Sequence, residues 1–236
     1  MEETNEKKQR RPRRTKTAIE ESIRNAAEKE ILENGFSDSL VSNILKKAKI
    51  EARVFYLRYK DLNEFYDEFV KNYDYWFTDL FKEEKINEVS AEGLETIFKK
   101  LLSSLNDSSV MLELLRWEVS RSNPTTERTA MLRELYTQKL TNSYEYAFKH
   151  SNIDVVAICS LIIAGIYYLT LHKDRSPFCG IDLNKDSDKV RMAECLSWIA
   201  DRLFIIKKEQ DNRRIISEKL RQKGVSEDII SECVMS

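Results

Sequence analysis

Glycine and proline are scarce in this chain of 236 residues, which has five of the first and three of the second. A β-sheet protein needs turn residues at intervals of about 8 to 12 positions, and glycine and proline supply many of them. This low count of glycine and proline excludes a sheet-rich fold. Because 42% of the residues are hydrophobic, a sizeable core can still be buried, and the sequence predicts an all-α fold.

Residues that bind metals or carry catalysis are also few. The chain has two histidines and four widely spaced cysteines, none of them in a CxxC pair. It shows no glycine-rich phosphate loop, no nucleophile elbow and no metal-ligand spacing. We therefore expect no enzyme activity, no metal site and no cofactor. The N-terminus is too polar for a secretory signal, so the sequence predicts a cytoplasmic chain with reduced thiols.

One segment needs to be tested as a membrane span. Residues 155–171 carry no charge, and their length is at the lower limit for crossing a bilayer. The segment includes Ser160, Gly165 and Thr170 among its apolar residues. We interpret it as a helix buried in a large core or in an oligomer interface, which also requires apolar residues on most sides.

Charge is unevenly distributed along the chain. Residues 7–60 hold 15 Lys and Arg against 7 Asp and Glu, whereas residues 61–236 hold 24 against 30. A basic head on an acidic body is typical of a protein whose head meets a polyanion. The charge pattern therefore favours a nucleic acid as a partner.

The basic head has the pattern of three helices. After an arm of residues 1–16, a Thr17–Glu20 capping box predicts a first helix that ends at Asn34-Gly35. Ser37 and Ser39 are candidate caps for a second helix to about residue 47, and a turn at 48–50 leads to a third helix at 51–57. The inner face of this unit is predicted to contain Ile44, Leu45, Ala48, Ile50, Val54 and Phe55, which leaves Ala52, Arg53 and Tyr56 outside.

Helix follows helix beyond the head. Asp61 starts a long fourth helix with an aromatic stripe from Phe65 to Leu80, and the last long helices are expected at about residues 153–172 and 186–208. We predict four parts: a flexible basic arm (1–16), a helix-turn-helix DNA-binding domain (17–60), a helical ligand-binding and dimerisation domain (61–212) and a C-terminal tail (213–236). The tail is expected to form one or two short helices broken at Gly224.

The head resembles the tetracycline-repressor (TetR) family of bacterial transcriptional regulators. The residues that carry the resemblance keep the family's spacing over about 40 positions: Ile23, Ala26-Ala27, Gly35-Phe36, Ser39, Val41, Ile44, Ala48, Ile50, Phe55-Tyr56, Tyr59 and Lys60. Lys49 stands where the family usually has glycine, and it must adopt a left-handed or strained backbone if the geometry is kept. Glu51, Leu45 and Leu57-Arg58 also depart from the pattern, which affects the expected operator sequence more than the fold.

The resemblance implies a set of DNA contacts. Tyr56 and Lys60 correspond to phosphate contacts, with Ser37 or Ser39 also near the backbone. Arg53 is the candidate for reading a guanine edge, and Ala52 for touching a thymine methyl group. Arg13, Arg14 and Lys16 of the arm are candidates for the minor groove or for phosphates; the alternative is a solvated, disordered basic tail.

The resemblance also implies a homodimer with a ligand pocket. In the family, helices four to seven enclose the pocket, and the last two long helices pair with a second subunit. The pocket candidates are aromatic: Tyr73, Trp76, Phe77, Trp117, Tyr136, Tyr144 and Tyr167. Ordinary core packing is the alternative for each of them. A dimer places two recognition helices about one DNA turn (~34 Å) apart, which implies a palindromic double-stranded DNA operator.

The sequence thus predicts a sequence-specific repressor that a small molecule releases from DNA. The alternative is a helix-turn-helix regulator controlled by a protein partner, or by no ligand at all. A hydrophobic void among the helices that follow the head favours a ligand, whereas a solidly packed core favours the alternative.

Overall fold

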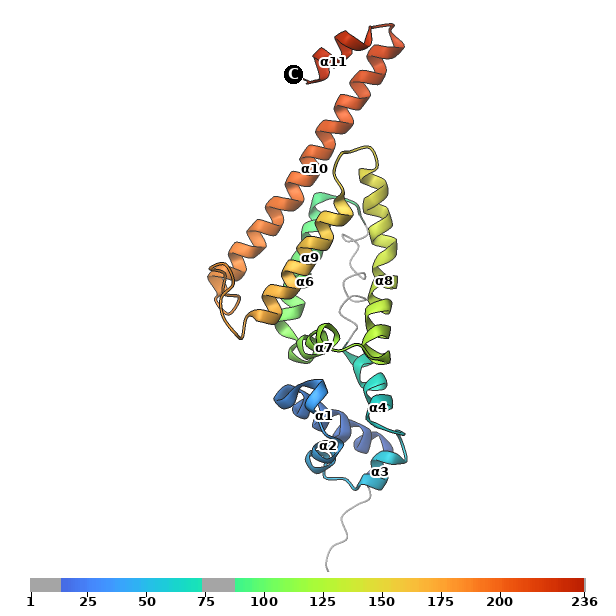
Figure 1. Ribbon diagram of the computed structural model, residues 1–236, viewed down its shortest axis with the longest axis vertical. Helices are drawn as coiled ribbons and strands as arrows, with labels where there is room; N and C mark the ends of the chain where they lie inside the picture. Colours follow the sequence, from blue (N-terminus) through green and yellow to red (C-terminus); the bar gives the residue numbers. More distant parts are fainter. Residues whose placement is uncertain (1–13, 74–87, 236) are drawn as a thin grey trace, which may run out of the picture. The chain divides into compact units, whose positions relative to one another are not determined.

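The computed structural model describes residues 14–73 and 88–235, and their regular elements are helices without a strand (Figure 1). The all-α prediction is therefore confirmed for the described part of the chain. The chain divides into two compact units, one ending at Phe69 and one beginning at Val70.

The first unit consists of four helices around a small core. They are α1 (Lys16–Asp38), α2 (Val41–Ala48), α3 (Ala52–Tyr56) and α4 (Leu62–Phe69). Five core residues have no exposed surface: Ile23, Ala27, Ile31, Ile44 and Phe55. Phe36 lies edge-on to Tyr66 and Phe69, with ring centroids 5.2 and 6.1 Å apart. Phe65 and Phe69 of α4 thus belong to the core of this unit, which explains why the unit extends to Phe69, beyond the expected end at residue 60.

The ends of the first two helices differ from the prediction. Helix α1 is capped by Thr15, whose hydroxyl accepts a hydrogen bond from the Ala18 amide at 3.2 Å, and the predicted Thr17 cap lies inside the helix. At Gly35 the backbone turns with φ 76°, yet helical structure resumes to Asp38. Helix α2 follows Leu40 and has no side-chain cap, so neither Ser37 nor Ser39 plays the predicted capping role.

The fourth helix is also shorter than expected in the described residues. It ends at Phe69 and is followed by one turn of 3-10 helix, Val70–Asn72. Its start is as predicted, because the Asp61 carboxylate accepts a hydrogen bond from the Glu64 amide at 2.9 Å. The candidates Trp76 and Phe77 lie outside the described residues.

The second unit is built around α6. The α-helices described in this unit are α6 (Ala91–Asp107), α7 (Ser109–Ser120), α8 (Pro124–Phe148), α9 (Val155–His172), α10 (Asp186–Gln222) and α11 (Glu227–Met235). Helix α6 packs against α7, α9 and α10, and Phe98, Leu101 and Leu105 fill the space between them with at most 1% of each side chain exposed. The side chains of Ser90 and Asn123 cap α6 and α8.

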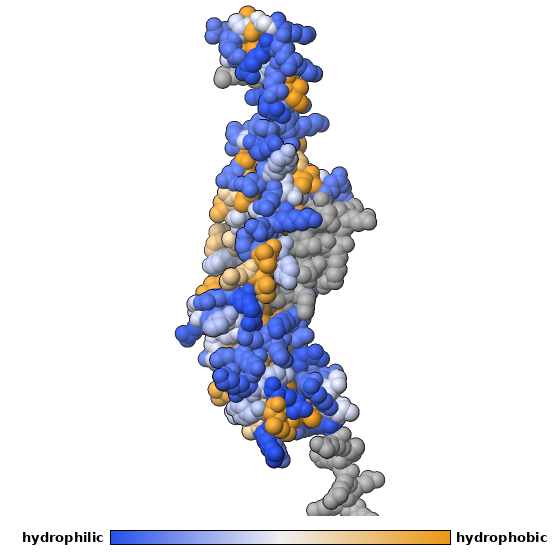
Figure 2. Space-filling view, turned by 90° about the vertical axis from the view of Figure 1, so that its right-hand side faces the viewer, coloured by the Kyte–Doolittle hydropathy of each residue, from blue (hydrophilic) through white to orange (hydrophobic). Residues whose placement is uncertain are grey.

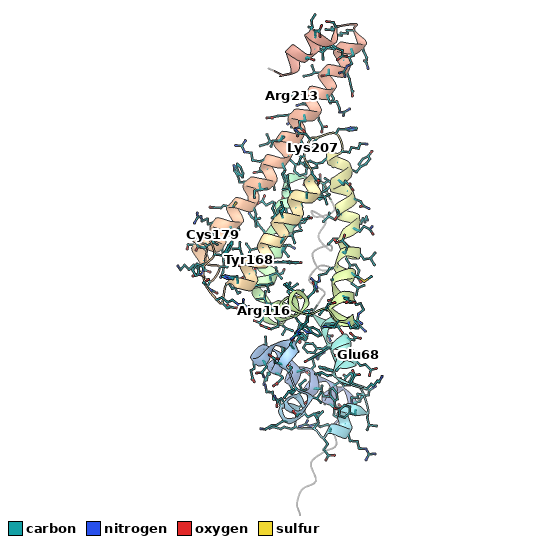
Figure 3. The ribbon with its side chains drawn as sticks, in the orientation of Figure 1. Glu68, Arg116, Tyr168, Cys179, Lys207 and Arg213 are labelled. Atoms are coloured by element: carbon teal, nitrogen blue, oxygen red, sulfur yellow. The ribbon has the colours of Figure 1, made fainter. Side chains whose placement is uncertain are left out.

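Helix α10 is longer than predicted. We expected it to end near residue 208, but its 37 residues continue to Gln222. No glycine or proline interrupts this stretch, and ion pairs one turn apart, such as Lys207–Asp211 at 2.7 Å, support its exposed part. Lys207 and Arg213 mark this part of the helix in Figure 3. The predicted break at Gly224 is confirmed (φ 78°), and α11 then packs back on α10.

The apolar helix α9 is less buried than expected. Within one chain only Val155, Ile166 and Thr170 are buried, whereas Leu161 is 74% exposed. By length and composition alone α9 could cross a membrane, and one such helix is weak evidence for a membrane protein. On the face of the molecule shown in Figure 2, hydrophobic residues form separate patches on a mostly hydrophilic surface.

Candidate nucleic-acid interface and ligand cavity

The third helix depends on the rest of its unit for stability. Five residues are too few to form a stable helix alone. Phe55 anchors α3, because its side chain is fully buried and its ring lies 5.1 Å from Tyr59 and 5.7 Å from Phe65. Just after the helix, the Arg58 guanidinium donates a hydrogen bond to the Val54 carbonyl at 2.7 Å.

The opposite side of α3 faces solvent. Ala52, Arg53 and Tyr56 are exposed, and Tyr56 is 53% exposed, so their predicted outward orientation is confirmed. The side chain of Leu57, which was not among the predicted contacts, is 72% exposed. Its amide donates to the Arg53 carbonyl at 3.1 Å, so Leu57 lies one helical turn from Arg53 on the same side. The spacing of four residues from Arg53 was the signal that could have identified it.

The turn before α3 has the strained backbone that the sequence predicts. Lys49 adopts the left-handed conformation, with φ 53° and ψ 50°. Its amide donates to Lys46 and the next amide, of Ile50, donates to the Leu45 carbonyl, both at 3.2 Å. These bonds satisfy the carbonyls at the end of α2. The same unit also carries three exposed, positively charged side chains, those of Lys46, Lys49 and Lys60.

A buried carboxylate ties α1 to α2. Glu30 is 1% exposed, and its oxygens lie 2.7 Å from the Lys47 ammonium and 2.7 Å from the Asn43 amide nitrogen. Burial alone raises the pKa of Glu30, but the hydrogen bonds from Lys47 and Asn43 outweigh it and lower the pKa below its usual value. The ion pair therefore fixes the helix that precedes the turn.

Some predicted DNA contacts have other partners. Ser39 is 4% exposed and donates its hydroxyl to the Gly35 carbonyl at 2.6 Å, an arrangement that disfavours the predicted phosphate contact. Ser37 is exposed. Arg14 donates to the Ala48 carbonyl at 3.1 Å, and Lys16 lies 3.8 Å from Glu20. Arg13 lies outside the described residues.

The second unit contains a cavity of about 420 Å³ between α6, α7, α8 and α9. Its volume lies in the range of small-molecule sites. The walls are mainly apolar, with Leu94, Ile97, Phe98, Leu140 and Ile163 among the lining residues.

Two charged side chains meet in the cavity wall. Arg133 of α8, 7% exposed, forms an ion pair with Glu118 of α7. The Thr129 hydroxyl donates a further hydrogen bond to Glu118 at 3.1 Å. Burial raises the pKa of two other lining residues, Tyr144 to about 12 and Cys159 to about 11.

Only some of the predicted pocket aromatics line this cavity. Tyr144 and Tyr167 do. Trp117 is a buried core residue, Tyr136 is 49% exposed, and neither of them nor Tyr73 lines the cavity. The burial of Trp117 favours the alternative of ordinary packing for this residue.

The chain shares its fold with a solved transcriptional regulator. The crystal structure of the transcriptional regulator FadR from Bacillus subtilis in complex with stearoyl-CoA matches with a TM-score of 0.57. The match covers 76% of this chain and 96% of that one, at 19% sequence identity, so the similarity concerns the fold. No family model matches this chain, and no curated protein sequence matches it.

Proposed function

We propose that this chain is a TetR-like transcriptional regulator that binds duplex DNA through α3. The observation that carries the proposal is the solvent-facing side of α3, where Arg53 is presented by a helix whose other side is locked by Phe55. A guanidinium in this position can bond a guanine edge bidentately in the major groove. The fold shared with a solved transcriptional regulator supports the same function.

The neighbouring groups suit the DNA backbone. Tyr56 and Lys60 are exposed, and we assign them to phosphate contacts together with Ser37. Lys46 and Lys49 add positive charge, which promotes association with any duplex sequence. In this division of roles, Arg53 determines sequence preference, and the lysines and Tyr56 position the helix.

We further propose a homodimer that pairs through α9 and α10. On α9, Leu161 and Tyr168 are 74% and 48% exposed, and on α10, Trp198 and Ile205 are 60% and 44% exposed. Figure 3 labels Tyr168 on α9. Burying these side chains against a second copy removes large apolar surfaces from water. A dimer also gives the two-fold symmetry that a palindromic operator requires.

The cavity supports control by a small molecule. A void of about 420 Å³ with mostly apolar walls is the feature that separates a ligand-responsive regulator from one with a solid core. The solved regulator of the same fold was crystallised with stearoyl-CoA. We propose that a ligand in the cavity favours a different separation of the two recognition helices and so releases the operator. A ligand that prefers the released state by a few kcal/mol is sufficient for this shift.

The test is selection of bound fragments from random duplex DNA by the purified full chain, followed by binding titrations. Arg53→Ala should lose about 1–3 kcal/mol on the selected site and relax base preference there. Lys60→Ala should weaken binding to all sequences and reduce the salt dependence by about one phosphate contact. Lys29→Ala, an exposed lysine on α1, is the matched control. If the chain retains no duplex DNA at modest ionic strength, the proposal is wrong.

A further inference from the structure

The charges in the cavity wall are balanced against each other. Arg133 and Glu118 have side-chain exposures of 9% and 19%. An isolated charge in such a place is costly, whereas a hydrogen-bonded pair is tolerated. The pair therefore contributes one positive and one negative charge, and no net charge, to the buried wall.

The other ionisable groups of the wall add no buried charge. Loss of solvent around the buried Tyr144 and the partly buried Cys159 raises their pKa values to about 12 and about 11, so both are neutral at pH 7. Glu134 also lines the cavity, but it is exposed, and water screens its charge. Among the described lining residues, the buried surface is thus apolar or neutral, apart from one balanced pair.

We propose that the cavity selects an uncharged, mostly apolar molecule carrying a hydroxyl or carbonyl group that hydrogen-bonds to the Glu118–Arg133 pair. This inference rests on the proposed ligand-responsive function and names its ligand class. A ligand carboxylate would add a second negative charge beside Glu118 against a single guanidinium. A ligand ammonium would add a second positive charge beside Arg133. Either ion leaves one charge of the buried group uncompensated.

Three probes with the same ten-carbon chain test this selectivity: 1-decanol, decanoate and decyltrimethylammonium, all below their micelle-forming concentrations. Their binding to the full chain is measured by isothermal titration calorimetry at pH 7 and by displacement of the neutral dye N-phenyl-1-naphthylamine. We expect decanol to bind at least about tenfold more tightly than either ion, since each ion brings an unbalanced charge into the cavity. Equal binding of decanol and decanoate would overturn the inference.

Two substitutions should change the preference in opposite directions. Glu118→Gln keeps the size of the side chain but removes one negative charge from the wall beside Arg133, so decanoate should gain about tenfold or more and overtake decanol. Arg133→Gln leaves Glu118 unbalanced and should favour decyltrimethylammonium in the same way. Glu145→Gln, at an exposed position of α8 outside the cavity lining, is the control and should keep the wild-type order.

Circular dichroism melts establish which variants are folded. Either Glu118→Gln or Arg133→Gln, if folded, is sufficient to test the proposed ligand selectivity. A folded variant with the wild-type order of probes contradicts the inference and leaves a ligand-binding cavity in place. If none of the three probes binds the wild-type chain, the inference fails together with the ligand part of the proposed function. The proposal that α3 binds DNA is tested separately, by the DNA-binding titrations described above.

Discussion

Replacing Glu30 with glutamine should loosen the first unit and remove part of its sensitivity to acid. Glu30 accepts hydrogen bonds from Lys47 and Asn43, both at 2.7 Å, and from Asn34 at 3.1 Å. Glutamine keeps the size but loses the charge, and a hydrogen bond to a charged group contributes about 1.5–3 kcal/mol. Lys47 retains a second carboxylate, Glu33, at 2.5 Å, so we expect the lower part of this range, about 2 kcal/mol.

The pH dependence has a definite sign. Because the pKa of Glu30 is lowered in the folded chain, its contribution to stability is present above the ordinary carboxyl pKa of about 4.3. It is lost as the pH falls through the lower folded-state pKa. The difference between wild type and Glu30→Gln should therefore be largest at pH 7 and shrink in acid.

Hydrogen exchange followed by mass spectrometry measures this effect locally. Peptides from α1 and α2 should exchange about thirtyfold faster in Glu30→Gln at pH 7, the equivalent of about 2 kcal/mol. Glu21→Gln, an exposed position on the same helix, is the control and should leave exchange unchanged. An acceleration below about threefold, or a difference that grows in acid, would refute the assigned role of Glu30.

Three further outcomes are expected. Deoxyuridine in place of thymidine in the selected DNA should weaken binding by the wild type more than by Leu57→Ala, because the 72% exposed Leu57 offers an apolar contact to the methyl group that uracil lacks; equal losses in gel-shift titrations would exclude this contact. Trp198→Glu should yield monomers in sedimentation, whereas Ile229→Glu on α11 should not. Lys49→Gly should raise the unfolding free energy in urea by about 0.5–1 kcal/mol, because glycine tolerates φ 53°, and a decrease would contradict the strain argument.

Local signals in the sequence were sufficient for the first three helices. The periodic residues Ile23, Ile44 and Phe55 lie in the core. The glycine that the TetR family usually has at the position of Lys49 predicted the left-handed backbone found there. The role of Ser39 was not predictable in this way. A serine ahead of a helix favours a cap, but the kink at Gly35 leaves an unpaired carbonyl that Ser39 satisfies instead.

Residue type alone could not separate cavity wall from core. Trp117, Tyr136 and Tyr144 are all aromatic, yet one is packed, one is exposed and one lines the cavity, because their positions depend on how helices far apart in sequence meet. The Glu118–Arg133 pair was missed for the same reason: its members lie on different helices. The length of α10 was missed because its polar final turns have no apolar stripe to reveal them, although i,i+4 ion pairs support them.

The fold-back of α11 limits how the chain can be shortened. Ile230 is 3% exposed, and Arg221 holds Glu227 with two hydrogen bonds of 2.6 and 3.1 Å. A truncation at Gly224 would remove this contact from the end of α10, which already carries the exposed Ile215 and Ile216. Crystallisation or display versions of the protein should therefore either retain the whole terminus or stop before Arg213.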